Sequence, residues 1–201
     1  IRDRFTPQVM AGLPRGQMAV GHVRYGTTGT QPRINAQPIS INHIKGSMAL
    51  AHNGNLTNAY ELRRELELKG SIFYTTIVNE RINADSIEEA VSGAMKKLKG
   101  AYSLVIMSSS KLLAARDPQG FRPLCMGKLG ESTVFASESC ALDSIGATFT
   151  RDIEPGEIVV VDESGVRSIR DNCNDEKKSL CVFEFIYFAR PDSVVDGSSV
   201  H

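Results

Sequence analysis

The chain has 201 residues, of which 41% are hydrophobic, and it contains 17 glycines and 8 prolines. This length suits one globular unit with a sizeable core, with room for an appendage but not for a second complete domain. Lysine plus arginine and aspartate plus glutamate both number 23, so the net charge is zero and no basic surface for nucleic acid is expected.

Cysteine usage and hydropathy indicate a cytoplasmic protein. The four cysteines form no CxxC pair and lack the spacing of a disulfide scaffold. No apolar stretch approaches the ~20 residues that span a bilayer. The first residues, IRDRFTPQVM, lack the apolar core of a signal peptide. We therefore expect no membrane partner.

The first third of the chain predicts a loop, a strand and a helix. Residues 1–46 are rich in Gly, Pro, Thr and Asn, and we expect a brief strand in MAVGHV (18–23) followed by a long ordered loop. SMALAHNG (47–54) predicts a buried strand. Asn58 and Glu61 then have the spacing of a capping box, which predicts a helix that ends near Gly70.

The next elements are a second helix and a series of strands. Ser86 and Glu89 form another capping box before an apolar helical face that ends at a lysine-rich turn. AYSLVIMS (101–108) and KLLAARD (111–117) predict adjacent buried strands. TVFASE (133–138), a short helix over 140–145 and a hairpin in GEIVVVDESGVRSI (156–169) follow.

The order of these elements predicts the fold class. Strands cluster and helices come in a group, which favours a layered α+β fold with largely antiparallel sheets over a doubly wound parallel sheet. The tail differs: a polar stretch over 170–179 precedes LCVFEFIYFARPDSVVDG (180–197), which is dense in aromatic residues. We interpret residues 1–178 as the domain and residues 179–201 as a connector that leaves the core.

ALAHNGNLTN (49–58) contains the first candidate site. Asn-Gly after a strand is a strong hairpin signal, so a plain turn is one interpretation. In the other, the Asn53 side-chain amide and the Gly54 N–H converge on a developing negative oxygen, each donor contributing on the order of 3 kcal/mol to acyl transfer. The two residues alone do not decide between these interpretations.

GHVRYGTTGTQPR (21–33) contains the second candidate site. Arg24 could hold a carboxylate in a bidentate manner, with Thr27 and Thr28 as neutral donors. A surface arginine beside a flexible glycine loop is the favoured interpretation of this stretch taken alone.

The remaining candidates are weaker. The four histidines have no metal-binding spacing, and only His52 is next to a candidate site. Asp117, in ARDPQGFRP, is predicted to form a turn with Pro118 and Gly120. Cys140 stands at a plausible helix start but has no histidine near it in sequence, so it is not expected to be a nucleophile.

Eight motifs in order resemble one family over nearly the whole chain. They are GHVRYGTTG, NAQP, ALAHNGNLTN, GAYSLVIMS, AARDPQGFRPLC, FASESCALD, PGEIVVVD and FIYFARPDS. Together they resemble the glutaminase half of the amidophosphoribosyltransferase family. Other class II glutamine amidotransferases carry a Trp and a His in the arginine loop. Here that loop instead has Tyr25 and Gly26 after Arg24. The FIYFARPDS tail also resembles the amidophosphoribosyltransferase family more than the other amidotransferases.

The resemblance implies a fold and a site. The fold is the N-terminal-nucleophile hydrolase sandwich, an α+β fold of four αββα layers with two antiparallel sheets, here incomplete at the N-terminus. Asn53 and Gly54 would form the oxyanion hole. The residues that would bind glutamine are Arg24, Tyr25, Thr27, Thr28 and His52.

The resemblance also implies a reaction. Glutamine is hydrolysed through a γ-glutamyl thioester on an N-terminal cysteine, whose α-amine, with an ordinary pKa of about 7.7 to 8.0, is the base. The ammonia passes to a C-terminal phosphoribosyltransferase domain. There, with Mg²⁺, it displaces pyrophosphate from phosphoribosyl pyrophosphate, giving 5-phosphoribosylamine for purine synthesis.

Further family properties concern the metal and the assembly. The resemblance implies a homo-oligomer. Some members carry a 4Fe-4S cluster to which a connector cysteine contributes, and Cys181 stands at about that place. A small buried thiol is the favoured alternative for Cys181.

The sequence departs from the family in three places. It begins at Ile1, downstream of the family's cysteine, so we expect a protein of these residues alone to be inactive. It stops before the phosphoribosyltransferase domain. FYTTIVNER (73–81) lacks the aspartate that binds the glutamine amino group in the family.

These departures leave two interpretations. Ile77 reads as the middle of a helix without a cap, so we expect that Thr76 and Ile77 are not covalent neighbours and that the missing segment includes the aspartate. The alternative is a non-catalytic pseudoenzyme or regulatory domain of the same fold. A glutaminase that serves a different acceptor is disfavoured by the tail.

Overall fold

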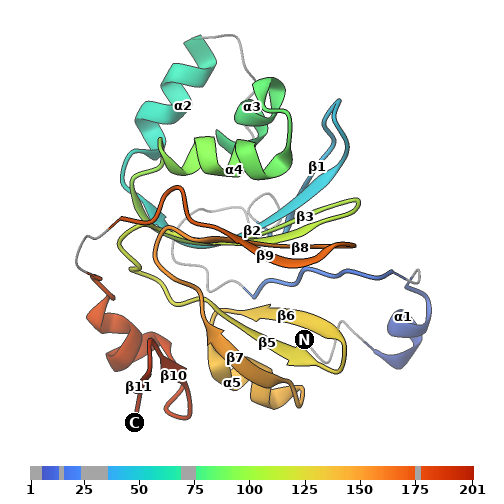
Figure 1. Cartoon of the computed structure of the whole chain (residues 1–201), viewed down its shortest axis with the longest axis vertical. Helices are drawn as coiled ribbons and strands as arrows, with labels where there is room; N and C mark the ends of the chain where they lie inside the picture. The colour runs from blue at the N-terminus through green and yellow to red at the C-terminus, as the bar shows by residue number, and fades with distance from the viewer. Residues whose placement is uncertain (1–5, 14–15, 24–35, 69–75, 175–177) are drawn as a thin grey trace.

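The structure is a computed structural model that describes residues 6–13, 16–23, 36–68, 76–174 and 178–201. Its main helices and strands stack in four layers (Figure 1). From one side to the other these are a helical layer, a large sheet, a small sheet and a short helix. The predicted α+β sandwich with two antiparallel sheets is therefore confirmed.

The large sheet has six antiparallel strands in the order β1-β2-β3-β4-β8-β9. Their bounds are β1 Ile39–Ile41, β2 Met48–Leu56, β3 Gly100–Ser108, β4 Leu112–Arg116, β8 Ile158–Asp162 and β9 Gly165–Ile169. β2 pairs with β3, β3 with β4, and β8 with β9, each without a register shift. The predicted adjacent strands at 101–108 and 111–117 and the predicted hairpin at 156–169 are therefore confirmed.

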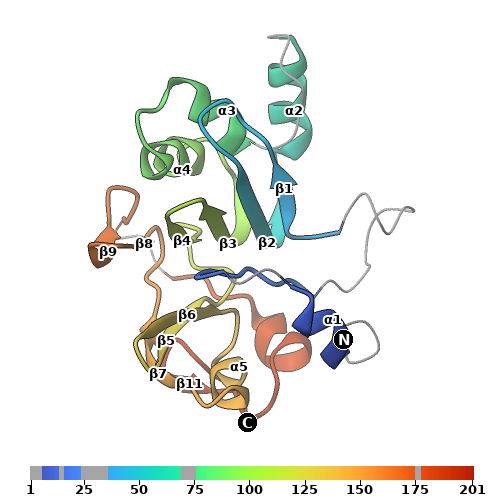
Figure 2. The same cartoon turned by 90° about the vertical axis from the view of Figure 1, so that its right-hand side faces the viewer.

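Three helices cover one face of this sheet: α2 Ala59–Leu68, α3 Thr76–Asn83 and α4 Ile87–Met95 (Figures 1 and 2). α4 begins with the predicted capping box, because Ser86 Oγ accepts from Glu89 N at 3.1 Å and Glu89 Oε2 accepts from Asp85 N at 2.8 Å. Ala90 and Val91 of α4 are fully buried. The first core lies between these helices and the sheet.

Strand alternation produces a second core on the other face of the sheet. Leu113 and Ala115 of β4 face the helices, whereas Ala114 between them packs on the small sheet. The small sheet has the order β6-β5-β7, with β5 Cys125–Leu129, β6 Ser132–Ala136 and β7 Thr148–Asp152. Met126 of β5 contributes to this second core.

The fourth layer is α5 Ser139–Ser144, which packs on the outer face of the small sheet. Leu142 of α5 and Cys125 of β5 belong to the core between them. Neighbouring residues of β5 thus serve different cores, as the period of two in a strand requires. Burial raises the pKa of the Cys125 thiol to about 12, so this cysteine is an apolar core residue.

The remaining elements lie at the two ends of the chain. They are α1 Pro7–Ala11, a π-helix η1 Glu184–Phe188, and a small hairpin of β10 Val194–Val195 and β11 Ser198–Ser199. The segment with η1 and the hairpin lies beside the small sheet (Figure 1). It packs on the domain, where Val195 is 1% exposed and Asp196 pairs with Arg116. The role of residues 179–201 as a connector to a further domain stays a prediction.

Two local predictions are wrong. MAVGHV forms no strand in the described residues, and the expected long loop over 1–46 is interrupted by α1 and β1. Asn58 does not act as a helix cap through its side chain. Its amide instead donates to Lys97 O at 2.8 Å and accepts from Lys99 N at 3.0 Å, joining the start of α2 to the turn before β3.

Candidate functional site

Asn53 and Gly54 lie inside β2, opposite Ser103 and Tyr102 of β3. The strand continues to Leu56, so Asn-Gly does not form a hairpin turn here. The turn interpretation is therefore wrong, and both residues are held in the large sheet next to its centre.

Gly54 is needed by the backbone. Its φ is +139°, and a Cβ placed there would lie 2.1 Å from Ala101 O and 2.7 Å from Ala101 C. No side chain fits at that distance, so β2 and β3 approach each other closely only with glycine at this position. This requirement explains the glycine without reference to a ligand, and it fixes the backbone that follows Asn53.

Asn53 lies on the face of β2 that is directed toward the small sheet. Residues opposite each other in an antiparallel pair project on the same face. Ser103, opposite Asn53, donates from Oγ to Pro123 O at 3.1 Å, in the segment that leads into β5. Asn53 is partly exposed, and no described residue is hydrogen-bonded to its side chain.

The backbone of His52 lies between β3, where it is opposite Leu104, and the Gln37 side chain. Its N–H donates to Gln37 Oε1 at 2.6 Å, so the Gln37 side chain continues the β1–β2 ladder beyond Ile39. The ring is largely buried, and Nε2 has no hydrogen-bond partner. Burial lowers the pKa of His52, an interaction with the Ala101 backbone partly opposes this, and the charges of His22 and Arg122 add smaller lowerings, so the imidazole is neutral near pH 7.

The predicted glutamine-binding loop cannot be placed beside these residues. Arg24, Tyr25, Thr27 and Thr28 lie outside the described residues. The expected border between Arg24 and Asn53 therefore stays a prediction.

The two cysteines singled out from the sequence have clear environments. Cys140 is 6% exposed in the first turn of α5, and burial raises the pKa of its thiol, which agrees with the prediction that it is not a nucleophile. Cys181 is partly exposed, and its N–H donates to Phe121 O at 3.2 Å. Within the described residues no group of three or more His, Cys, Asp or Glu could hold a metal ion, so these residues do not by themselves form a cluster site.

Sequence reasoning missed a buried polar centre at the end of β4. Arg116 is 0% exposed, and its guanidinium donates to Arg122 O, Ile153 O, Gly120 O and both carboxylate oxygens of Asp196, at 2.7 to 3.1 Å. The signal was an arginine at the end of the apolar run KLLAAR, because a charge in a buried strand needs partners.

Asp117 forms the turn that was predicted for it. Its carboxylate accepts from the backbone N–H groups of Gln119 and Phe121 at 3.0 to 3.1 Å. Burial raises the pKa of Asp117, and these hydrogen bonds oppose that rise. The residue is a structural centre of the loop after β4.

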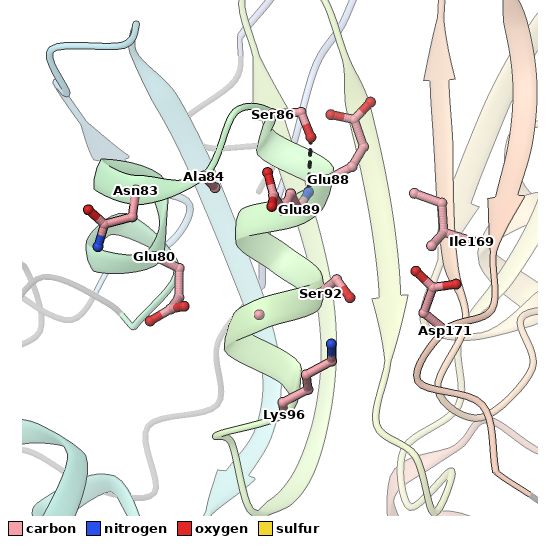
Figure 3. A pocket seen from close by; sticks show the side chains of 11 residues that line it. Glu80, Asn83, Ala84, Ser86, Glu88, Glu89, Ser92, Lys96, Ile169 and Asp171 are labelled. Carbon is pink, nitrogen blue, oxygen red and sulfur yellow. Dashed lines mark hydrogen bonds between the residues drawn. The ribbon is translucent and has the colours of Figure 1, made fainter.

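A separate hollow lies on the other side of the large sheet. An open pocket of about 590 Å³ lies between α3, α4 and the end of β9 (Figure 3). Its acidic groups are engaged within the fold, because Glu88 pairs with Lys111 at 2.5 Å and Glu80 pairs with Lys97 at 2.6 Å. This pocket is on the helical side of the large sheet, opposite the face that carries Asn53.

Two antiparallel sheets between helical layers form the sandwich of the N-terminal-nucleophile hydrolase class, as in the similar solved structures. The glutamine amidotransferase domain model matches residues 22–144, which is more than half of the chain. The chain therefore belongs to the glutamine amidotransferase domain family.

Relatives and solved structures agree with this assignment. The chain is 43% identical over 195 residues to an amidophosphoribosyltransferase of Bacillus subtilis, covering 93% of this chain and 41% of the relative. It is 47% identical over 209 residues to a chloroplastic amidophosphoribosyltransferase of Vigna aconitifolia, covering 100% of this chain and 42% of that relative. The structure of glutamine phosphoribosylpyrophosphate amidotransferase from B. subtilis with ADP and GMP is similar with a TM-score of 0.79 and 41% identity, covering 90% of this chain and 40% of that one.

The chain spans less than half the length of these curated relatives. Thr76 and Ile77 both lie in α3, and the expected break between them stays a prediction. In the described residues, no helix is long and apolar enough to cross a membrane.

Proposed function

We propose that this chain is the glutaminase part of an amidophosphoribosyltransferase. It would hydrolyse glutamine and supply ammonia for the conversion of phosphoribosyl pyrophosphate to 5-phosphoribosylamine in purine synthesis. The observation that carries the proposal is the placement of Asn53 and Gly54 inside β2 of an amidotransferase fold.

The proposed roles follow from acyl-transfer chemistry. Attack on the glutamine amide places negative charge on its oxygen, and the Asn53 amide with the Gly54 N–H would stabilise that charge. His52, which is neutral, would not repel the α-ammonium group of glutamine. Because successive side chains of a strand project on opposite faces, it would act from the face of β2 that Asn53 does not occupy. Arg24, with Tyr25, Thr27 and Thr28, would hold the glutamine carboxylate.

The nucleophile would be the family's N-terminal cysteine, which this sequence does not contain. Its α-amine would take the thiol proton and return a proton to the departing ammonia. We extend the proposal to Mg²⁺ at the phosphoribosyltransferase domain, to a homo-oligomer and to a cytoplasmic location. Cys181 would contribute one ligand if the complete protein holds an iron–sulfur cluster.

Asn53→Ala in the complete protein containing this chain tests the proposal. We expect kcat for glutamine hydrolysis to fall about 10²- to 10³-fold, because one oxyanion donor is lost. Synthesis from added ammonia should be unchanged. Asn83→Ala, at an exposed amide on α3, is the matched control and should behave like the wild type. Equal hydrolysis by Asn53→Ala and wild type would refute the site.

A pseudoenzyme of the same fold is the second candidate. It is favoured by one observation of the sequence, namely that FYTTIVNER (73–81) lacks the aspartate expected from the family. N-terminal sequencing and intact mass of the protein from its native source distinguish the two. An N-terminal cysteine supports the enzyme, whereas a genuine start at Ile1 supports the pseudoenzyme.

A further inference from the structure

The C-terminal segment, residues 178–201, is joined to the loop that follows β4. Ser179 N donates to Gln119 O at 2.8 Å, and Cys181 N donates to Phe121 O at 3.2 Å. Two alternate residues of one segment thus bond through their backbones to two alternate residues of the other. The C-terminal segment therefore contacts the same loop that Asp117 folds.

Arg122 is the side chain at the centre of this contact. Its Nη1 pairs with Glu184 Oε1 in η1, and its guanidinium carbon lies 4.5 Å from the centre of the Phe188 ring. Glu184 is 3% exposed, so the pair is largely removed from solvent. A buried, charge-assisted contact of this kind is much stronger than an exposed ion pair.

The same residue also reaches the strands of the candidate site. The Arg122 carbonyl accepts from Arg116 Nε at 2.7 Å, and it shares the one Ser103 hydroxyl proton with the Pro123 carbonyl, at 3.3 and 3.1 Å from Ser103 Oγ. Ser103 is the residue of β3 directly opposite Asn53. These contacts place the backbone of Arg122 between the C-terminal segment and the strands of the site.

The guanidinium of Arg122 is only partly paired. Its Nε is buried and has no hydrogen-bond partner, although Nη1 is paired. Since a buried unpaired donor costs free energy, the guanidinium is held in place by Glu184 and Phe188 and not by a complete set of its own bonds. Removing the Glu184 charge should therefore move Arg122.

We propose that Arg122 is a positioning residue that couples the C-terminal segment to the strand carrying Asn53 and Gly54. Glu184 and Phe188 hold its side chain, and its carbonyl holds Ser103 in register with Asn53. The inference rests on the proposed glutaminase function, and it adds that hydrolysis depends on how the C-terminal segment is docked.

The test compares three single variants of the complete protein containing this chain with the double variant Arg122→Gln/Glu184→Gln. Arg122→Gln removes the cation, and Glu184→Gln removes only its partner and leaves the Arg122 carbonyl in place. Arg190→Gln is the control, because it breaks an ion pair of the same C-terminal segment, Arg190 with Asp192 at 2.8 Å, in which both side chains are more than half exposed. For each, kcat and KM for glutamine hydrolysis, synthesis from added ammonia, and the hydrogen exchange of residues 50–56 are measured.

We expect Arg122→Gln to lower kcat for glutamine about 10- to 100-fold and Glu184→Gln to lower it about tenfold, because small misplacements of catalytic groups are costly. Synthesis from ammonia should be unchanged. Exchange in residues 50–56 should be faster in both variants and unchanged in Arg190→Gln. The double variant should be no slower than Arg122→Gln, because the two residues act as one unit.

Other outcomes overturn the inference. If both variants keep the kcat and exchange of Arg190→Gln and lose only thermal stability, Arg122 is merely structural. Additive losses in the double variant would show that the two residues act separately. Failure of Arg122→Gln to fold leaves Glu184→Gln to decide. If wild type and Arg190→Gln do not hydrolyse glutamine, the proposed function fails, and the coupling to hydrolysis fails with it.

Discussion

The strand with Asn53 and Gly54 and the loop after Arg116 both contact β3, but they use their polar groups in opposite ways. In the loop, all five guanidinium N–H donors of Arg116 are paired within the fold, and the Asp117 carboxylate is surrounded by backbone N–H groups. At the strand, His52 Nε2 is buried without a partner, and no described residue bonds to the Asn53 amide.

This difference separates stability from ligand binding. A buried group whose hydrogen bonds are complete has nothing left for a substrate, and its removal leaves its partners unpaired. A polar group that the fold does not satisfy is available to a ligand. The loop should therefore respond to mutation through stability, and the strand through activity, except where backbone packing intervenes.

The largest expected effect is at Arg116. Arg116→Met should lower the free energy of unfolding by roughly 3 to 5 kcal/mol, because it leaves the Asp196 carboxylate and three carbonyls without their donor. Urea unfolding measures the loss. Arg63→Met is the control, since its ion pair with Glu67 is more than half exposed on both sides, and it should change stability by less than about 1 kcal/mol. Equal losses in the two variants would contradict the comparison.

The next largest effect on stability is expected at Gly54, where β2 lies too close to the β3 backbone for a side chain. Gly54→Ala should cost on the order of 2 to 3 kcal/mol more than Gly165→Ala in urea unfolding. Both glycines have positive φ, but a Cβ at Gly165 meets nothing within 4 Å, whereas one at Gly54 would clash with the Ala101 carbonyl. The pair of variants isolates the clash from the backbone preference. If the two variants lose the same stability, β2 and β3 are not in close contact at Gly54.

These two sites show what sequence could and could not provide. The strand at Asn53 follows from the apolar run before it, and the α4 capping box from Ser86 and Glu89, because both signals are local. The five partners of Arg116 could not be predicted, because Asp196 lies 80 residues away and meets it only through the docked C-terminal segment.

Asn-Gly and Asn58 show where local signals misled. Asn-Gly usually forms a two-residue turn, but here β3 pairs with β2 past Gly54, so tertiary pairing decides. Asn58 had the spacing of a cap, yet its side chain bonds to Lys97 and Lys99 across the fold. The roles of Asn53 and Arg24 came from the family resemblance and could not be deduced from spacing.

A smaller effect is expected at Tyr102, which contacts both regions. It lies opposite Gly54, and its carbonyl accepts from Asp117 N at 2.9 Å. Its hydroxyl is buried without a partner, and burial raises its pKa. Tyr102→Phe should therefore raise stability by about 1 kcal/mol, because the desolvated hydroxyl is removed while the ring is kept. Tyr187→Phe, at a ring that is 73% exposed, should change nothing measurable. A loss of stability in Tyr102→Phe would mean that the hydroxyl has a partner.

The smallest effect is a pH dependence at His52. Burial, aided by the charge of Arg122, lowers the pKa of His52 below its ordinary value of 6.5. The unfolded chain then binds more protons at this position than the native state, so stability is lost as pH falls below about 6.5 toward the folded pKa. The slope for one proton is at most about 1.4 kcal/mol per pH unit.

His52→Gln should reduce this pH dependence and leave stability above pH 7 less affected. The control is His43→Gln at a partly exposed ring, where Nδ1 accepts from Lys45 N at 3.1 Å and the lowering of the pKa also begins with burial. Because His43 lacks the buried, unpaired ring nitrogen that His52 has, its removal should change the slope less. NMR titration of the imidazole C–H signals identifies the group directly. If the His52 ring titrates at or above pH 6.5, it is hydrated and more easily protonated than its burial indicates. Its polar group would then not be unpaired, and the contrast with the fully hydrogen-bonded loop after β4 would not hold at this residue.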